Sequence, residues 1–363
     1  MSYQILKKIY DEFGDWGYAW LQASVSEIKS CGIHDEMAEI IVQKRKLIDV
    51  NREIDTLWQK DIFLVERENS EYPKLLKKIS DAPFLLYRKG ARLDSLPSGV
   101  AVVGTRTPSA YGERMSYEIG EKLGFLGLTV VSGLAFGADA SAHLAAVQNG
   151  YPTVAVLASG IEKITPSSHT SLARMILEKG GAIVSEYPPS MQAMKHHFLW
   201  RNRIISGLSK ATIVVEAQKR SGALSTAEHA LKQQRKVFAL VGDIDRAQVQ
   251  GCLQLLLNKK AEPLYDLGQL ENWGENSGEK KLHITGVMEC EILLSLSRKR
   301  TSAEIAERIE KESSMVAVQL SLLEIQGMVE RDIIGNYKLT VLGKKLRLEA
   351  LRARALAAKE NCF

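Results

Sequence analysis

Six short apolar runs recur at regular intervals along the middle of the chain, and they restrict the possible folds more than any other feature. Each run is almost purely apolar, as in strands that helices cover on both faces. The segments between the runs are long enough to hold a helix that returns the chain for parallel pairing. The pattern predicts an α/β fold whose core is an extended Rossmann-like, mostly parallel doubly wound sheet. The runs are GVAVVG (99–104), LTVVSG (128–133), TVAVLA (153–158), AIVSE (182–186), ATIVVEA (211–217) and KVFALVG (236–242).

The sequence on either side of these runs divides into further parts. Apolar residues at helical spacing fill the N-terminal part, where Gly14 and Gly32 are expected to end helices. Near the C-terminus, three helical segments, one opened by a Thr301-x-x-Glu304 capping box, and a hairpin predict a winged helix. We expect a small helical (SAM-like) domain at 1–80, the Rossmann-like domain at 81–268, a linker at 269–282, the winged helix at 283–342 and a basic helical tail at 343–363.

Composition excludes several classes of protein. Hydrophobic residues make up 45% and charged residues 25% of the chain, as in ordinary globular proteins. No run of eighteen apolar residues predicts a membrane span, and the N-terminus lacks the apolar core of a secretory signal. The four cysteines form no C-x-x-C pair, which favours reduced thiols in a cytoplasmic protein over disulfides or zinc. A net charge of +5 permits a polyanionic partner without requiring one.

Small residues follow the strand-like runs at the points where helices are expected to begin. Such turns let backbone N–H groups approach an anion, and helix N-termini add partial positive charge. Ordinary tight turns use the same residues, so each turn alone is weak evidence. Together they favour a row of anion sites along one edge of the sheet. The turns are Gly104-Thr105-Arg106, Ser132-Gly133, Ser159-Gly160 and Ser221-Gly222.

The segment 195–220 adds charge and aromatic rings. It contains six Lys and Arg residues and one Glu, and its first part interleaves Lys195 and Phe198 with Arg201 and Arg203. Phosphates of single-stranded nucleic acid need cations, and unstacked bases need flat partners, so this combination favours single-stranded DNA or RNA. For Trp200 we favour a place in the core.

No catalytic or metal site is predicted. Asp139 and His143 lie at i and i+4 of one expected helix and could form a base and its orienting partner, but a hydrogen bond that braces the loop is the favoured interpretation. The sequence contains no G-x-x-x-x-G-K-[ST] loop and no recognisable ligand set. We therefore expect no cofactor, no metal and no enzymatic activity.

Two other functions remain open at this stage. The skeleton Gly222…Thr226…Glu228 partly matches the loop of lysine-decarboxylase-like phosphoribohydrolases, which would make the chain a nucleotide-hydrolysing enzyme, although the paired glycines of that loop are missing. A transcription regulator acting through 283–342 is the other alternative. Its third expected helix carries no Arg or Lys to read base edges, which argues against it.

The motifs VAVVGTRTPSAYG, VVSGLAFGADASAH, FLWRNRIISGLS and VVEAQKRSGALSTAEHAL occur in an order that resembles the DNA-processing protein A (DprA/Smf) family. The resemblance implies a bacterial cytoplasmic protein that binds single-stranded DNA during natural transformation. It also implies that the protein protects incoming strands, helps to load the recombinase RecA and forms a homodimer through the Rossmann-like domain. The sequence departs most from the family around 241–262, where dimer and recombinase contacts are expected.

The resemblance also implies a DNA pocket built from the turn with Arg106, the turn with Ser132 and Gly133, and the segment with Lys195 and Phe198. Combined with the strand-end turns and the basic segment, it gives a set of expected DNA-binding residues. The set consists of Gly104, Thr105, Arg106, Ser132, Gly133, Lys195, Phe198, Arg201, Asn202, Arg203, Ser221 and Gly222.

Overall fold

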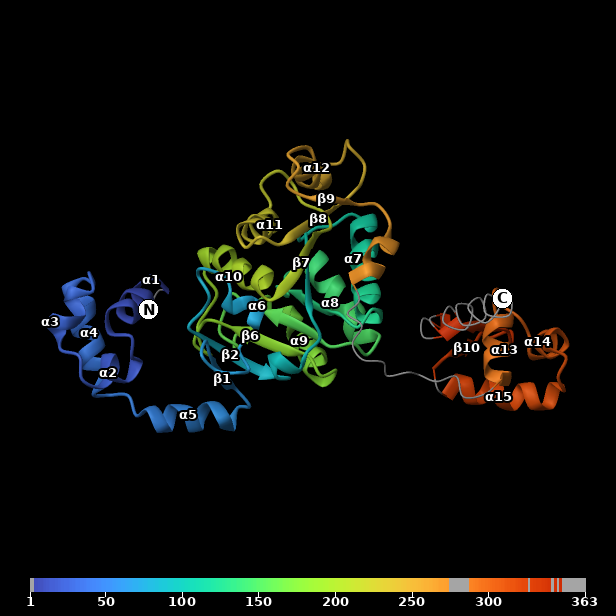
Figure 1. Ribbon diagram of the computed structural model, residues 1–363, viewed down its shortest axis with the longest axis horizontal. Helices are drawn as coiled ribbons and strands as arrows, with labels where there is room; N and C mark the ends of the chain where they lie inside the picture. The colour runs from blue at the N-terminus through green and yellow to red at the C-terminus, as the bar shows by residue number, and fades with distance from the viewer. Residues whose placement is uncertain (1–2, 274–286, 326, 341–342, 345, 348–363) are drawn as a thin grey trace, which may run out of the picture. The chain divides into compact units, whose positions relative to one another are not determined.

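The computed structural model describes residues 3–273 and 287–347, except 326, 341–342 and 345 (Figure 1). Contacts divide the chain into two compact units, Met1–Glu275 and Asn276–Phe363. The division falls within the range 269–282 that the sequence assigns to a linker. Most of that range and most of the expected basic tail lie outside the described residues.

The first unit contains a nine-stranded sheet in the order β1-β2-β6-β5-β4-β3-β7-β8-β9. All six apolar runs form strands, and β3 to β9 pair in parallel. Only β1 and β2, at one edge, pair antiparallel to their neighbours. The predicted fold class is therefore confirmed. The strands formed by the runs are β3 (Gly99–Val103), β4 (Thr129–Ser132), β5 (Thr153–Val156), β6 (Ala182–Ser185), β7 (Ser209–Val214) and β8 (Lys236–Leu240).

Three further strands extend the sheet at its edges: β1 (Phe63–Glu66), β2 (Leu85–Gly90) and β9 (Glu262–Leu264). The sheet therefore begins earlier than the boundary expected at 80/81. The short helix α6 (Lys74–Lys77) also precedes that boundary, and its Leu76 is fully buried in the same core as Val65 of β1.

Helices cover both faces of the sheet. Because side chains alternate along β3, Val100 and Val102 lie in the apolar core on the first face of the sheet. Ala101 and Val103 lie in the core on the second face. The first face is covered by α7 (Ala110–Phe125), α8 (Ala138–Gln148) and α9 (Thr170–Glu178). The second is covered by α6, α10 (Lys195–Gly207), α11 (Gly222–Lys232) and α12 (Gln250–Leu257). Single 3₁₀ turns occur at Leu93–Ser95, Ser167–His169 and Ala247–Val249, and a longer one at Leu267–Trp273.

The N-terminal part is helical, as the periodicity predicts. Ile9, Ile28 and Ile41 form the centre of a small core of its own. Gly14 and Gly32 both have positive φ, 64° and 69°, directly after the helices they were expected to end. The helices are α1 (Tyr3–Phe13), α2 (Trp16–Leu21), α3 (Val25–Ser30), α4 (Asp35–Arg45) and α5 (Val50–Gln59).

The second unit has three helices followed by a two-stranded antiparallel hairpin. The Thr301 backbone N–H donates to the Glu304 carboxylate at 2.8 Å, and the Glu304 N–H donates back to the Thr301 hydroxyl at 3.3 Å, which forms the expected capping box. Its classification as a winged helix stays a prediction. The elements are α13 (Val287–Ser295), α14 (Ser302–Ile309), α15 (Ser313–Ile325), β10 (Val329–Arg331) and β11 (Tyr337–Leu339).

Within the described residues, no helix is both long and apolar enough to cross a lipid bilayer.

Candidate functional site

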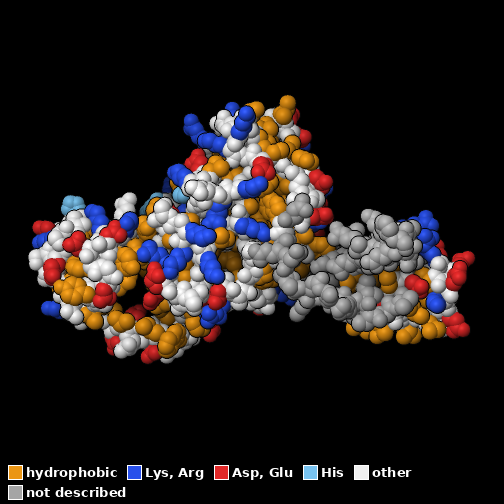
Figure 2. All heavy atoms as spheres, viewed as in Figure 1, with side chains coloured by type: hydrophobic (Ala, Val, Ile, Leu, Met, Phe, Trp, Pro, Cys, Tyr) orange, Lys and Arg blue, Asp and Glu red, His pale blue; other side chains and the backbone are white. Residues whose placement is uncertain are grey.

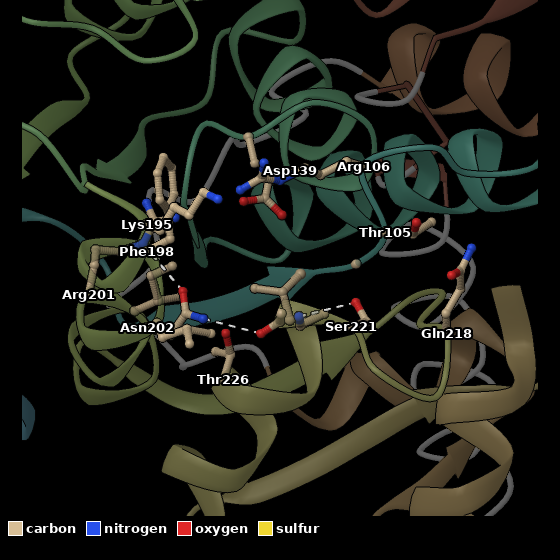
Figure 3. A pocket seen from close by; sticks show the side chains of 17 residues that line it. Thr105, Arg106, Asp139, Lys195, Phe198, Arg201, Asn202, Gln218, Ser221 and Thr226 are labelled. Carbon is tan, nitrogen blue, oxygen red and sulfur yellow. Dashed lines mark hydrogen bonds between the residues drawn. The ribbon is translucent and has the colours of Figure 1, made fainter. Parts of the chain in front are cut away.

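The direction of the chain through the sheet reverses beside β3. From β3 the chain moves through β4, β5 and β6 on one side, and then crosses to β7 on the other side of β3. Doubly wound sheets bind ligands at such a point, outside the carboxyl ends of the strands. A pocket of about 460 Å³ opens there, and we call it the switch-point pocket. In Figure 3, Lys195 and Phe198 of α10 lie on one side of it, and Gln218 and Ser221 of the β7–α11 loop lie on the other.

The loop after β3 is held rigidly. The Thr105 N–H donates to the Glu216 carbonyl at 2.7 Å, and the Thr105 carbonyl accepts from the Ala138 N–H at 3.2 Å. A Cβ at Gly104 would lie 2.6 Å from the Cβ of Ala138, so the close approach of the β3 loop to α8 requires glycine. These contacts fix the backbone from which Arg106 projects.

The Arg106 side chain is exposed, and its guanidinium lies 5.1 Å from the centre of the Phe198 ring. Within the described residues, no carboxylate lies within 4.0 Å of Arg106 or of Lys195. A cation over an aromatic face is attracted by the ring quadrupole. The pocket therefore has two unpaired cations and one aromatic ring at its mouth.

One face of α10 supplies much of the pocket wall. Lys195, Phe198 and Asn202 lie at i, i+3 and i+7, a spacing that aligns side chains along a helix. The Asn202 side-chain amide donates to the Gly222 carbonyl at 3.2 Å. This bond joins the α10 wall to the N-terminus of α11.

Arg201 forms a buried cationic wall of the pocket. Its guanidinium donates to the Gly133 carbonyl at 2.8 Å and to the Val156 carbonyl, and its side chain is 4% exposed. Burial lowers the pKa of Arg201 to about 10, and the nearby Asp139 carboxylate opposes that shift. The charge is thus held in place by the loops after β4 and β5.

Asp139 braces the loop after β4. Its carboxylate accepts from the Gly133 N–H at 3.0 Å. Burial raises the pKa of Asp139, while Arg201 and the Gly133 N–H oppose the rise. His143 has a different partner, since its Nδ1 lies 2.8 Å from the Thr153 hydroxyl. The favoured interpretation of Asp139, a loop-bracing hydrogen bond, is confirmed.

The N-terminus of α11 forms the opposite wall. The Ser221 hydroxyl accepts from the Ala223 N–H at 3.3 Å and so caps the helix. A Cβ at Gly222 would meet no atom within 4 Å, so this position faces open space. The neighbouring Lys219 and Arg220 are exposed.

The N-terminus of α7 differs from the expected anion site. The carboxylate of Glu216, which is 1% exposed, accepts from the Ser109 N–H at 2.9 Å and from the Ser109 hydroxyl at 2.6 Å. A buried carboxylate needs such donors, and a helix N-terminus favours it electrostatically. The chain therefore fills this anion site with its own side chain, and a bound anion must be held elsewhere in the pocket.

Three of the expected residues, Ser132, Gly133 and Arg203, do not line the pocket. Arg203 is fully buried, its guanidinium donates to both Glu186 oxygens at 2.6 Å, and it lies 4.4 Å from the Trp200 ring. Ser132 is also fully buried, and its hydroxyl donates to the Val102 carbonyl at 2.6 Å. The Arg203 and Ser132 side chains both have internal partners, which argues against the expectation that they contact DNA.

Gly133 touches the site indirectly, through its bonds to Asp139 and Arg201. The other expected residues line the pocket together: Gly104, Thr105, Arg106, Lys195, Phe198, Arg201, Asn202, Ser221 and Gly222. Several neighbours were not expected from the sequence, of which Gln218 had a usable signal because it directly follows the apolar run 211–217. The additional lining residues are Val103, Ala135, Asp139, Leu199, Ile205, Gln218, Ala223 and Thr226.

Residues 63–272 match the family model described as DNA recombination-mediator protein A. Protein Smf of Escherichia coli is 37% identical over 286 residues, which cover 75% of this chain and 76% of that protein. DNA processing protein DprA of Streptococcus pneumoniae is 43% identical over 186 residues, 51% of this chain and 65% of that protein.

Two solved structures are similar in fold. The crystal structure of DprA from Streptococcus pneumoniae has a TM-score of 0.63 at 31% identity and covers 76% of this chain and 94% of its own. DNA processing protein A from Helicobacter pylori, reported for its single-stranded DNA binding mode, has a TM-score of 0.53 at 29% identity and covers 58% and 94%. With a family model matching most of the first unit and relatives aligned along three quarters of their length, the chain belongs to the DNA recombination-mediator protein A family, which includes DprA and Smf.

Proposed function

We propose that this chain binds single-stranded DNA in the switch-point pocket, in the cytoplasm, without catalysing a reaction. In this role it protects incoming strands during natural transformation and helps to load RecA onto them. Membership in a family of recombination mediators supports the role, as does the likeness to the Helicobacter pylori protein reported for its binding of single-stranded DNA.

The observation that carries the proposal is the grouping of Arg106, Lys195 and Phe198 at the mouth of one pocket. The two cations have no acidic partner within the described part of the chain, so they are available to phosphates. Phe198 offers a flat partner for a base, and such stacking contributes about 1–3 kcal/mol per base. Charge and ring stacking accept any base, so binding is expected to be independent of sequence.

The acids of the pocket favour binding over hydrolysis. Among its described lining residues the only carboxylate is Asp139, which is buried and holds the Gly133 N–H. Glu228, the acid of the phosphoribohydrolase-like skeleton, does not line the pocket. A hydrolytic site needs a carboxylate free to move a proton, so we prefer the binding function.

The test compares the parent with Arg106→Ala and Lys195→Ala. Affinity for an oligothymidine is measured at about 50 mM and about 200 mM salt, beside a duplex of equal length. Each variant is expected to weaken single-strand binding and to reduce its salt dependence, because one phosphate contact is lost. Lys44→Ala, an exposed lysine that does not line the pocket, is the control. Parental affinity in both pocket variants would show that the strand binds elsewhere.

We also propose a homodimer formed through the Rossmann-like domain. Three exposed apolar side chains lie in this region: Ile244 before α12, Leu257 at the end of α12, and Tyr265 directly after the edge strand β9, which are 77%, 82% and 75% exposed. Apolar side chains exposed in one region favour protein contacts. Leu257→Asp is expected to give a monomer in sedimentation, and a parent that sediments as a monomer at all concentrations would refute the dimer.

A further inference from the structure

The cations of segment 195–220 do not all belong to the switch-point pocket. Lys210 is the second residue of β7, whereas the pocket lies beyond the opposite end of that strand. Six strand residues span about 20 Å, so Lys210 is separated from the pocket by about that distance. Lys210 therefore lies at the opposite edge of the sheet, where the parallel strands begin.

A second pocket, of about 630 Å³, opens at that edge beside the start of β7 and β8 and the end of α11. Among its described lining residues, five cationic side chains stand against one carboxylate, that of Asp81. The Asp81 carboxylate lies 3.8 Å from the buried Arg203 guanidinium, so its negative charge already interacts with a cation outside this set. The cations of this second pocket are Lys78, Lys210, Lys232, Arg235 and Lys236.

Internal bonds orient some of these cations. Lys210 donates to the Trp273 carbonyl at 2.5 Å, and Arg235 donates to the Leu75 and Gly207 carbonyls at 2.8 and 3.3 Å. For Arg235 these two carbonyls, which carry no net charge, are the hydrogen-bond partners within the described residues. Lys236 has a carboxylate partner, Glu262, at 3.2 Å.

Lys78 and Lys232 are exposed, and within the described residues neither side chain forms an ion pair or a hydrogen bond. Each lies at the C-terminal end of a helix, α6 and α11, where the dipole favours a cation. The dipoles account for these two positions alone. They do not explain why Lys210, Arg235 and Lys236 converge on the same hollow.

The two pockets share α11. Gly222, Ala223 and Thr226 at its start line the switch-point pocket, and His229 and Lys232 at its end line the second pocket. An eleven-residue helix is about 16 Å long, a distance that a few nucleotides of an extended strand can span. Figure 2 shows Lys and Arg side chains gathered over the middle of the first unit on the face in view.

We infer that the second pocket is an additional phosphate-backbone site, occupied by the part of a single DNA strand that leaves the switch-point pocket. The inference rests on the proposed function. Convergent lysines, with no Phe, Tyr or Trp ring among the described lining residues, suit a sugar-phosphate chain, because phosphates need charge while bases need flat partners. The DNA strand is then held at two points along its length.

The test uses strand length to separate the two sites. An oligothymidine of about 4 nucleotides fills the switch-point pocket alone, and one of about 30 nucleotides can reach both pockets. The double variant Lys78→Ala/Lys232→Ala is expected to weaken binding of the long strand about threefold to tenfold and to leave the short strand unchanged. Its salt slope for the long strand is expected to fall by about 1.4, since single strands contribute about 0.7 per phosphate contact.

Two comparisons make the result specific. Lys44→Ala/Lys46→Ala removes the same charge from exposed positions that line neither pocket, and it is expected to bind both strands like the parent. Thermal melting checks that each variant is folded. Arg106→Ala is expected to weaken binding of both lengths.

If the second-pocket variant binds the long strand like the parent while Arg106→Ala does not, the inference is wrong and the proposed function stands. The same holds if it loses affinity for the two lengths equally, because the lysines would then belong to the first site. If Arg106→Ala binds both lengths normally, the proposed function itself fails.

Discussion

The carboxylate of Glu216 and the hydroxyl of Ser109 lie 2.6 Å apart, although 107 residues separate them in the sequence. Glu216 lies two residues beyond β7 and Ser109 caps α7, so the bond joins the end of β7 to the start of the helix that follows β3. It also places a negative charge where many Rossmann-like proteins hold a phosphate.

Replacing Glu216 therefore has a predictable effect. Glu216→Ala leaves the Ser109 N–H without an acceptor in a buried place and is expected to lower the free energy of unfolding by about 2 kcal/mol or more. Inorganic phosphate is expected to recover part of that loss in urea denaturation, because it can occupy the vacated helix N-terminus. Equal destabilisation in phosphate and in chloride of the same ionic strength would contradict this account.

Gly133 and Gly222 offer a matched pair of substitutions. A Cβ at Gly133 would lie 2.5 to 2.7 Å from the Arg201 guanidinium, whereas a Cβ at Gly222 meets nothing within 4 Å. Gly133→Ala is expected to displace Arg201 and to lower both stability and affinity for single strands. Gly222→Ala is expected to change the free energy of unfolding by less than about 0.5 kcal/mol. Similar melting temperatures for the two variants would refute the proposed role of Gly133.

Arg203 tests the distinction between buried and accessible cations. Arg203→Ala leaves Glu186 buried without its partner and is expected to destabilise the protein by about 3–5 kcal/mol. At a temperature where the variant is still folded, its affinity for an oligothymidine is expected to match that of the parent. Arg106→Ala is expected to give the opposite result, with normal melting and weaker binding. A folded Arg203→Ala protein that fails to bind would restore Arg203 to the DNA site.

His143 makes stability depend on pH. The Thr153 hydroxyl donates to the Val130 carbonyl, so the His143 Nδ1–H must donate to Thr153, and the buried Nε2 is left without a partner. Burial lowers the pKa of His143 from 6.5 to about 3. Between these values the unfolded imidazole binds a proton and the folded one does not, so stability falls as the pH falls, by up to about 1.4 kcal/mol per pH unit.

His143→Asn keeps a donor towards Thr153 but cannot titrate in this range. Urea denaturation at a pH of about 7 and of about 4.5 is expected to show a smaller loss in the variant than in the parent. Parallel losses would assign the acid sensitivity to other groups.

Burial explains which strands could be predicted from the sequence. The β3 run is buried at every position, and such strands leave unbroken apolar runs. β1 and β9 lie at the edges of the sheet, where only one residue of each is buried and β9 contains Pro263. Short edge strands with exposed positions have no pattern that separates them from loops.

Residue type predicted the cationic and aromatic character of the pocket better than it predicted which residues line the pocket. Arg201 and Arg203 are equivalent in a count of charges, yet two residues along a helix correspond to a rotation of about 200°. Arg201 therefore faces the pocket and Arg203 faces Glu186. Glu216 was missed as an internal anion because its sequence neighbours identify a strand and give no hint of Ser109 across the sheet.

The adjacency of β3 and β7 brings together two walls of the switch-point pocket that are far apart in the order of synthesis. A ribosome releases Arg106 long before it releases Ser221 and Gly222, which close the same hollow from the other side. A nascent or prematurely terminated chain that lacks α11 has one wall of the hollow and lacks the bond from Asn202 to Gly222. Under the proposed function, such a chain is expected to hold a single strand more weakly than a chain that includes α11.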